Sequence, residues 1–169
     1  MPTKPDLDVW DSCCLTGILN AEKDKLPALL SQTRRFEQGE AILGIPIVTI
    51  SEVSTLSDGT PAQPMIEKFL QNPYVETLLG TAEVGFLSGK LQHRFDSRRL
   101  PEMREGAIKA GVPNNQVVRL RRADADVLAT ALHYKAKRLT TYDPFLIFIG
   151  EKYITPETGW WDSLERLGS

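Results

Sequence analysis

Short runs of β-branched and apolar residues alternate with helical patterns along almost the whole chain. The β-type runs are residues 7–10, 45–50, 74–79, 138–141 and 152–155, and the helical patterns are residues 15–20, 27–36, 65–71, 81–95 and 123–135. A strand, a helix and a further strand in the same sheet connect in parallel, and the helices then cover both faces of the sheet. The alternation therefore predicts an α/β domain in which a mainly parallel sheet lies between two layers of helices.

Length and composition predict one globular domain over residues 1–169. The chain has 41% apolar and 25% charged residues and a net charge of -2, and no repeat or linker divides it. Its longest apolar stretches, residues 41–50 and 145–149, are shorter than the roughly 20 residues that span a bilayer, and its first residues lack a secretory signal pattern. We therefore expect a cytoplasmic protein with no membrane segment. The adjacent Cys13 and Cys14 exclude a disulfide framework and a structural zinc site.

Positive charge is concentrated in residues 89–122, which we call the basic segment. It holds 9 Lys and Arg against 3 Asp and Glu, whereas residues 1–88 hold 6 against 12 and residues 123–169 hold 5 against 7. Most of these cations are Arg, which suits bidentate contact with phosphate. Since basic stretches are also common on solvated helix faces, charge alone leaves nucleic-acid binding open.

Acidic residues follow the predicted strands at the positions where parallel sheets carry their ligand sites. Asp11 follows residues 7–10, Asp143 follows residues 138–141, and Glu52 follows residues 45–50 after Ser51, a good helix N-cap. Asp124 lies in the first turn of the helix 123–135, and the next strand brings the chain back to the same edge. The spacing predicts that the four carboxylates share one edge of the sheet.

A cluster of carboxylates repels itself unless a cation neutralises it, and ligands that are all oxygen favour Mg²⁺ or Mn²⁺ over zinc. The competing interpretation is that these acids are ordinary helix caps and surface charges. Asp6, Asp8 and Asp126 fall on other faces, and we expect them to be structural or exposed. The spacing does not decide between a metal site and helix caps.

Four sequence motifs surround these acids. Residues 7–15 read Leu-Asp-Val-Trp-Asp-Ser-Cys-Cys-Leu, residues 49–53 read Thr-Ile-Ser-Glu-Val, residues 123–132 read Ala-Asp-Ala-Asp-Val-Leu-Ala-Thr-Ala-Leu, and residues 139–143 read Leu-Thr-Thr-Tyr-Asp. They resemble the motifs of the PIN-domain nucleases, a family that includes the VapC-type toxins of bacterial toxin–antitoxin pairs. The resemblance spans nearly the whole chain.

The resemblance implies a PIN-like three-layer α/β/α sandwich and a metal-dependent endoribonuclease. The four acids would hold one or two Mg²⁺ or Mn²⁺ ions for hydrolysis of phosphodiester bonds in single-stranded or loop RNA. Ser12 and Thr141 are candidates to donate hydrogen bonds to a carboxylate or to water on the metal. Arg121 and Arg122, just before Asp124, are candidates for contacts with the flanking phosphates. The family also implies a homodimer and a small antitoxin partner.

Two segments, residues 53–64 and 94–122, look longer than a compact PIN domain requires, and we expect them to be insertions. Two other functions stay open: a structure-specific DNA nuclease with the same carboxylate chemistry, and a non-catalytic module that binds RNA or a partner protein. A phosphatase of the HAD type fits poorly, because its Asp-x-Asp motif would need a second acid where Cys13 stands.

Overall fold

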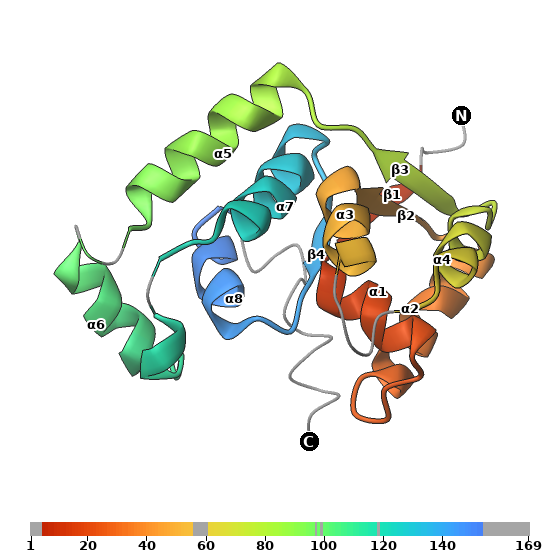
Figure 1. Ribbon diagram of the computed structural model, residues 1–169, viewed down its shortest axis with the longest axis horizontal. Helices are drawn as coiled ribbons and strands as arrows, with labels where there is room; N and C mark the ends of the chain where they lie inside the picture. Colours follow the sequence, from red (N-terminus) through yellow and green to blue (C-terminus); the bar gives the residue numbers. More distant parts are fainter. Residues whose placement is uncertain (1–4, 56–60, 97, 99, 118, 154–169) are drawn as a thin grey trace.

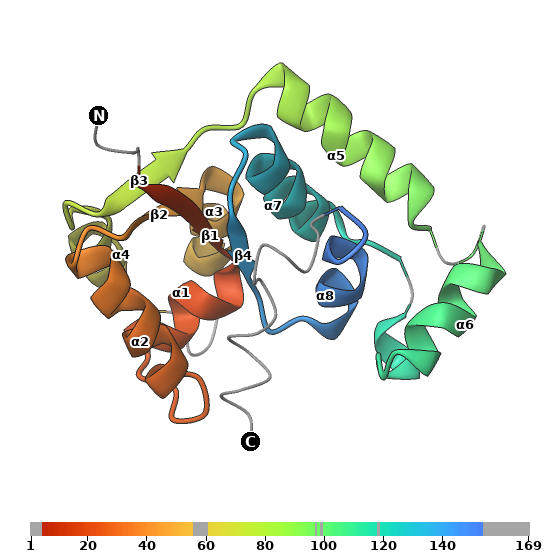
Figure 2. The same ribbon diagram turned by 180° about the vertical axis from the view of Figure 1, so that it is seen from behind.

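The computed structural model describes residues 5–55, 61–96, 98, 100–117 and 119–153. Its strands are β1 (Asp6–Trp10), β2 (Ala41–Pro46), β3 (Val75–Leu78) and β4 (Arg138–Thr140). Its helices are α1 (Ser12–Leu19), α2 (Leu26–Glu37), α3 (Ile47–Thr55), α4 (Gln63–Leu70), α5 (Ala82–Arg94), α6 (Pro101–Lys109), α7 (Arg122–His133) and α8 (Pro144–Gly150), with a short 3-10 helix η1 (Asn114–Gln116). Figures 1 and 2 show helices on both sides of the sheet.

The sheet is parallel throughout, with the strand order β3-β2-β1-β4. Strand β1 has a neighbour on each side, with Val9 opposite Gly44 of β2 and Leu139 of β4. This arrangement confirms the predicted α/β sandwich with a mainly parallel sheet. It also places the carboxyl ends of β1 and β4 side by side, where Asp11 and Thr141 continue the two strands.

Successive residues of β1 point to opposite faces of the sheet and enter two different cores. Val9 is fully buried in a core with residues of α5, α7 and α8, whereas Trp10 is fully buried in a core with residues of α1, α2 and α3. The Trp10 indole N–H donates to Gln32 Oε1 over 2.8 Å, and the Thr140 hydroxyl donates to the same oxygen over 3.0 Å. These contacts fix the ends of β1 and β4 directly before the acidic edge.

The predicted strand 45–50 is wrong in its position. Strand β2 ends at Pro46, and residues 47–55 form α3, so Ser51 lies inside a helix and is not its N-cap. Short apolar β-branched runs fit either a strand or a buried helix, and tertiary contacts decide between them. Here the helix buries Thr49 and Val53, which are one turn apart, and the Thr49 hydroxyl donates to the Trp10 carbonyl over 3.3 Å.

A further strand over residues 152–155 is also not observed where the chain is described. Lys152 and Tyr153 form a turn whose amides donate to carbonyls at the end of α8, and residues 154 and 155 lie outside the described residues. The apolar run 145–149 belongs to α8, which buries Phe145, Leu146 and Ile149.

The two segments expected to be insertions contain different secondary-structure elements. In the segment 53–64, α3 ends and α4 begins, and residues 56–60 lie outside the described residues. The segment 94–122 contains α6 and η1. Their status as insertions stays a prediction.

The acids assigned away from the site are structural or partly exposed. Asp8 is buried and accepts a hydrogen bond of 3.1 Å from Arg35, and Asp6 pairs with Lys137 at 2.7 Å. Within the described part of the chain, none of the helices is both long and apolar enough to cross a bilayer.

Candidate functional site

Asp11 lies at the junction of β1 and α1 and is almost completely buried. Its side chain is the N-cap of α1, where Oδ1 accepts from the Ser12 amide at 2.7 Å. The Thr141 hydroxyl donates to Oδ2 over 2.8 Å, and the Cys13 thiol lies 3.6 Å from the same oxygen. The Ser12 hydroxyl lies 3.4 Å from Oδ1, so both Ser12 and Thr141 contact this carboxylate, and their role beside a metal stays a prediction.

Asp143 occupies the equivalent place after β4, as the N-cap of α8. Its Oδ1 accepts from the amides of Phe145 and Leu146 at 2.8 and 3.0 Å. Its own amide donates to the Thr141 hydroxyl over 3.1 Å, so Thr141 contacts both acids. Asp11 and Asp143 therefore cap helices and also share one site, which means that the two interpretations of the sequence do not exclude each other.

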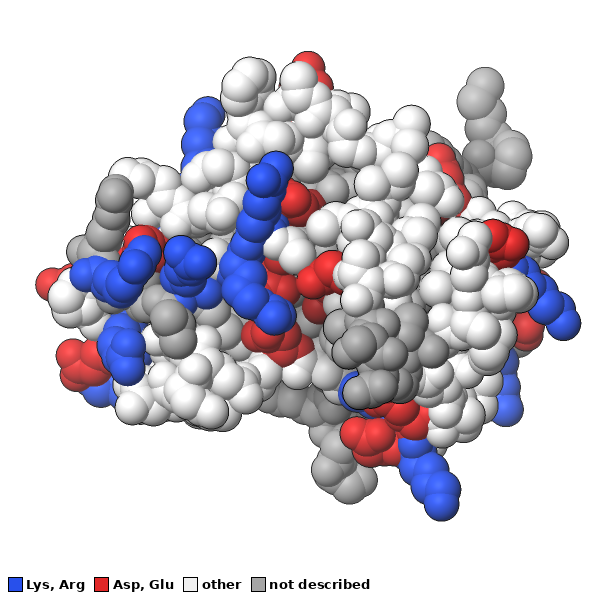
Figure 3. Space-filling model, viewed as in Figure 1, with Lys and Arg blue, Asp and Glu red and all other residues white. Residues whose placement is uncertain are grey.

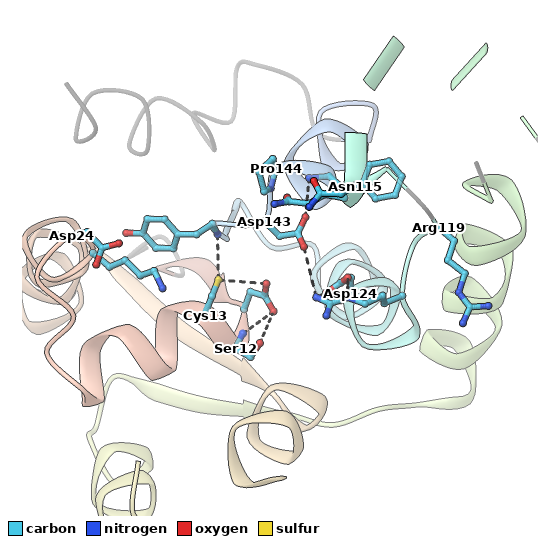
Figure 4. Close-up of a pocket in the computed structure, with 14 residues that line it drawn as sticks. Ser12, Cys13, Asp24, Asn115, Arg119, Asp124, Asp143 and Pro144 are labelled. Carbon is cyan, nitrogen blue, oxygen red and sulfur yellow. Dashed lines mark hydrogen bonds and ion pairs between the residues drawn. The ribbon is translucent and has the colours of Figure 1, made fainter. Parts of the chain in front are cut away.

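Asp124 approaches the site from the first turn of α7, as the spacing predicted, and its side chain is only 8% exposed. Figure 4 shows the side chains of Asp124 and Asp143 in the same part of the pocket, with Ser12 and Cys13 nearby.

Glu52 lies in the interior of α3 rather than in its first turn. It is close enough to Asp11 for the charge of Asp11 to raise the pKa of Glu52, although burial is the larger cause. Its Oε2 atom is buried and has no hydrogen-bond partner. Glu52 is therefore within electrostatic reach of Asp11, but it does not line the cavity that contains the other three acids.

A cavity of about 930 Å³ opens at this edge of the sheet. Asp11, Asp124 and Asp143 line it together with Lys25, Arg119 and Arg121. The acidic residues thus lie between basic groups contributed by different parts of the chain. In Figure 4, Arg119 lies beyond Asp124 on the side away from Cys13.

Arg121 pairs with both Asp124 and Asp143. Its Nε donates to Asp124 Oδ2 over 2.9 Å, and Nη2 donates to Asp124 Oδ1 over 3.3 Å. Nη2 also lies 3.7 Å from Asp143 Oδ2. The sequence led us to expect a phosphate contact from Arg121, but in this structure its guanidinium is held by carboxylates.

Burial, with a smaller contribution from neighbouring carboxylates, raises the pKa of Asp11 and of Asp124. Burial is the main cause that raises the pKa of Asp124 to about 6, and Asp11 and Asp143 add to it, while the hydrogen bond and charge of Arg121 oppose it. Burial also raises the pKa of Asp11 against the hydrogen bonds from Thr141 and Ser12, and the charge of Asp143 adds to the rise. The site therefore favours an additional positive charge.

The donor set fits a hard divalent cation in its chemistry. The ligands available are carboxylate oxygens, one of which, Glu52 Oε2, is buried without a partner. However, no three Asp, Glu, His or Cys side chains of the described ranges converge closely enough to hold an ion in the observed arrangement. Arg121 provides the positive charge between Asp124 and Asp143 instead.

Arg122 does not line the acidic cavity. Its side chain is 85% exposed, and its Nε lies 3.9 Å from Asp126 on the next turn of α7. Arg119 was not singled out from the sequence, yet it lines both the acidic cavity and a neighbouring cavity of about 340 Å³ that Arg98 and Arg122 also line. Figure 3 shows Lys and Arg side chains gathered beside the acidic centre of this face.

Sequence reasoning missed the pairing of Arg121 with Asp124. The signal was present, because oppositely charged residues three positions apart at a helix start commonly pair. The position of Arg119 beside the acidic cavity had no such local signal, since it depends on tertiary structure.

No protein-family model matches the sequence, and no curated protein matches it. Among solved structures, the fold resembles a crystal structure of VapBC2 from Rickettsia felis bound to a DNA fragment from their promoter. The sequences are 16% identical, the alignment covers 88% of this chain and 93% of the other, and the TM-score is 0.56. This similarity confirms the PIN-like fold, and at this identity it shows the fold alone.

We predict that Asp124→Asn stabilises the protein at neutral pH in the presence of EDTA. The folded-state pKa of about 6 lies above the ordinary value of 3.8, so the unfolded state releases the proton first as pH rises. Ionisation of buried Asp124 therefore lowers the free energy of unfolding. This loss of stability is absent below about pH 4, grows between about pH 4 and 6, and is complete above about pH 6. It corresponds to roughly 1 to 3 kcal/mol.

Urea denaturation of both proteins at pH 4 and pH 8 measures this difference. We expect similar stability at pH 4 and a more stable variant at pH 8. Asp126→Asn, on the same helix but outside the cavity, is the matched control. Greater stability of the parent protein at pH 8 would show that the ion pair with Arg121 outweighs the cost of burial.

Proposed function

We propose that this chain is a metal-dependent nuclease that hydrolyses phosphodiester bonds in RNA. The observation that carries the proposal is that Asp11, Asp124 and Asp143, from separate elements, line one cavity, while Glu52 is near enough to Asp11 for its pKa to be raised by that charge. The PIN-like fold supports a nuclease independently of these side chains.

The four carboxylates would hold one or two Mg²⁺ or Mn²⁺ ions. A bound ion of this kind supplies Lewis-acid activation of water and neutralises charge on the phosphate. The protein contributes the placement of its ligands. Asp11 accepts a hydrogen bond at each oxygen, from the Ser12 amide and the Thr141 hydroxyl, so its carboxylate cannot rotate without breaking both.

Helix N-termini stabilise two of the anionic ligands. Asp11 caps α1 and Asp143 caps α8, where free amides and the helix dipoles favour negative charge. Each acid keeps an oxygen that is not used by a capping amide: Asp11 Oδ2 faces Thr141, and Asp143 Oδ2 faces Arg121. These oxygens are the ones we assign to metal binding.

The substrate phosphates would be bound by the basic segment. Arg119 is exposed and lines the acidic cavity and the adjacent cavity, so one strand could pass from the acids onto its guanidinium. Arg122 lines the adjacent cavity, so we assign it to a phosphate farther from the reaction. The preference for RNA over DNA, the homodimer and the small antitoxin partner rest on the family resemblance.

A non-catalytic binding module is the second candidate. The observation that favours it is the pairing of Arg121 with Asp124 and Asp143, which neutralises the site without a metal. The two functions differ in whether the acids support turnover.

We predict metal-dependent cleavage of RNA that Asp124→Asn reduces by about 100-fold or more, because loss of a metal ligand removes several kcal/mol of transition-state stabilisation. The assay compares structured RNA, single-stranded RNA and DNA of the same sequence with Mn²⁺, Mg²⁺ or EDTA. Asp126→Asn should retain the activity of the parent protein, because its side chain lies outside the acidic cavity.

Equal behaviour of the parent protein and Asp124→Asn under every condition would contradict the nuclease and favour the binding module. Cleavage of DNA with little cleavage of RNA would support a metal-dependent nuclease but would show that its substrate is DNA and not RNA.

We predict that Arg119→Gln weakens RNA binding in EDTA and reduces the magnitude of the negative slope of log affinity against log salt by about 1, as expected for one lost phosphate contact. Arg34→Gln, in the last turn of α2, changes the net charge equally and is the control. Binding is measured by fluorescence anisotropy at several salt concentrations. The same slope in Arg119→Gln and the parent protein would remove Arg119 from the interface.

A further inference from the structure

We infer that Arg121 is a positioning residue that holds Asp124 and Asp143 as a resident cation and is displaced when a divalent metal ion binds. Arg121 thereby sets the metal affinity of the site. The inference rests on the proposed function, because it concerns the same carboxylates.

The contacts of Arg121 are those of a cation shared between two ligands. Nε and Nη2 bind the two oxygens of Asp124, and Nη2 extends toward Asp143. Bidentate pairs of this kind are the stronger class of charge-assisted hydrogen bond. A metal ion that used both acids would compete with this guanidinium for the same oxygens.

The position of the Arg121 side chain also allows it to move away from Asp124. It precedes the first residue of α7 as the N-cap, and it makes no side-chain capping hydrogen bond. Its side chain is 67% exposed, whereas that of Asp124 is 8% exposed. The ion pair therefore joins a buried carboxylate to an exposed guanidinium cation that can move into solvent.

A second location for the guanidinium lies next to the first. Arg121 lines the acidic cavity and the neighbouring cavity that contains Asp96, Arg98 and Arg119. Release from Asp124 would add Arg121 to the basic surface on which we place the RNA phosphates. The same residue would then neutralise the acids before metal binding and contribute positive charge to the substrate path afterwards.

Arg122 provides an internal comparison. It has the same charge and neighbours Arg121 in sequence, but its contact is with Asp126 at 3.9 Å, and it does not line the acidic cavity. A general electrostatic effect of removing an arginine would appear at both positions, whereas competition for the ligands would appear only at Arg121.

The test is a Mn²⁺ titration followed by electron paramagnetic resonance, using the full chain and the variants Arg121→Gln, Arg121→Lys and Arg122→Gln. We expect Arg121→Gln to bind Mn²⁺ at least about 10-fold more tightly than the parent protein, which corresponds to about 1.4 kcal/mol. Arg121→Lys should fall between them, since it keeps the charge without the bidentate fork. Arg122→Gln should stay within about 2-fold, because its charge is exposed and screened.

A second measurement follows Arg121 itself. The Nε–H signal of Arg121, assigned by its loss in Arg121→Lys, should shift during a Mg²⁺ titration of the parent protein and saturate with the same dissociation constant as binding. This readout requires neither RNA nor activity. Thermal unfolding of each variant checks that the folded state is retained.

Equal Mn²⁺ affinity of the parent protein and Arg121→Gln would overturn the displacement and leave the nuclease proposal intact. Weaker binding by Arg121→Gln would also overturn it, because Arg121 would then organise the ligands without competing for them. An Nε–H signal that does not respond to Mg²⁺ would contradict movement of the guanidinium. Failure of every variant to bind Mn²⁺ would overturn this inference and the metal-dependent function together.

Discussion

Parallel pairing of β1 with both β2 and β4 determines where the chemistry-bearing residues of this protein can lie. Asp11 and Thr141 continue adjacent strands in the same direction, and the hydroxyl of Thr141 reaches the carboxylate of Asp11 over 2.8 Å. Gln32 reinforces the arrangement from one core by accepting hydrogen bonds from Trp10 and Thr140, the residues just before them. Residues separated by 130 positions are thereby held in one site.

The same topology creates an electrostatic problem. Acids that follow β1 and β4 share one cavity with an acid from the first turn of α7, and burial raises the pKa of Asp11 and Asp124. Capping amides stabilise Asp11 and Asp143, and Arg121 pairs with Asp124 and Asp143. The protein can therefore fold with its acids together, and the site still favours a stronger cation.

Much of this arrangement could be predicted from the sequence, because hydrophobic periodicity and position relative to strand ends are local signals. They gave the parallel α/β architecture and the places of Asp11, Asp124 and Asp143. The boundary between β2 and α3 could not be read in this way, because residues 47–50 have β-branched side chains and become helical through contacts such as that of Thr49 with Trp10. Glu52 consequently lies beside the cavity rather than in it.

The sequence shows the positive charges of the basic segment, but the partner of each charge depends on the fold. Arg121 and Arg122 are adjacent in sequence, yet one binds the site acids and the other approaches Asp126. Local spacing permitted an Arg121–Asp124 pair, whereas the placement of Arg119 between two cavities depends on tertiary structure.

We propose that these acids form a metal site that Arg121 occupies in the absence of metal. The most direct measurement is a crystal structure of the protein grown with saturating Mn²⁺, with anomalous scattering recorded near the manganese edge. The account predicts an anomalous peak at the carboxylates of Asp11, Asp124 and Asp143, with Arg121 no longer paired with Asp124. An Arg121 that remains bound to Asp124 and Asp143, with no anomalous peak beside them, would contradict the account.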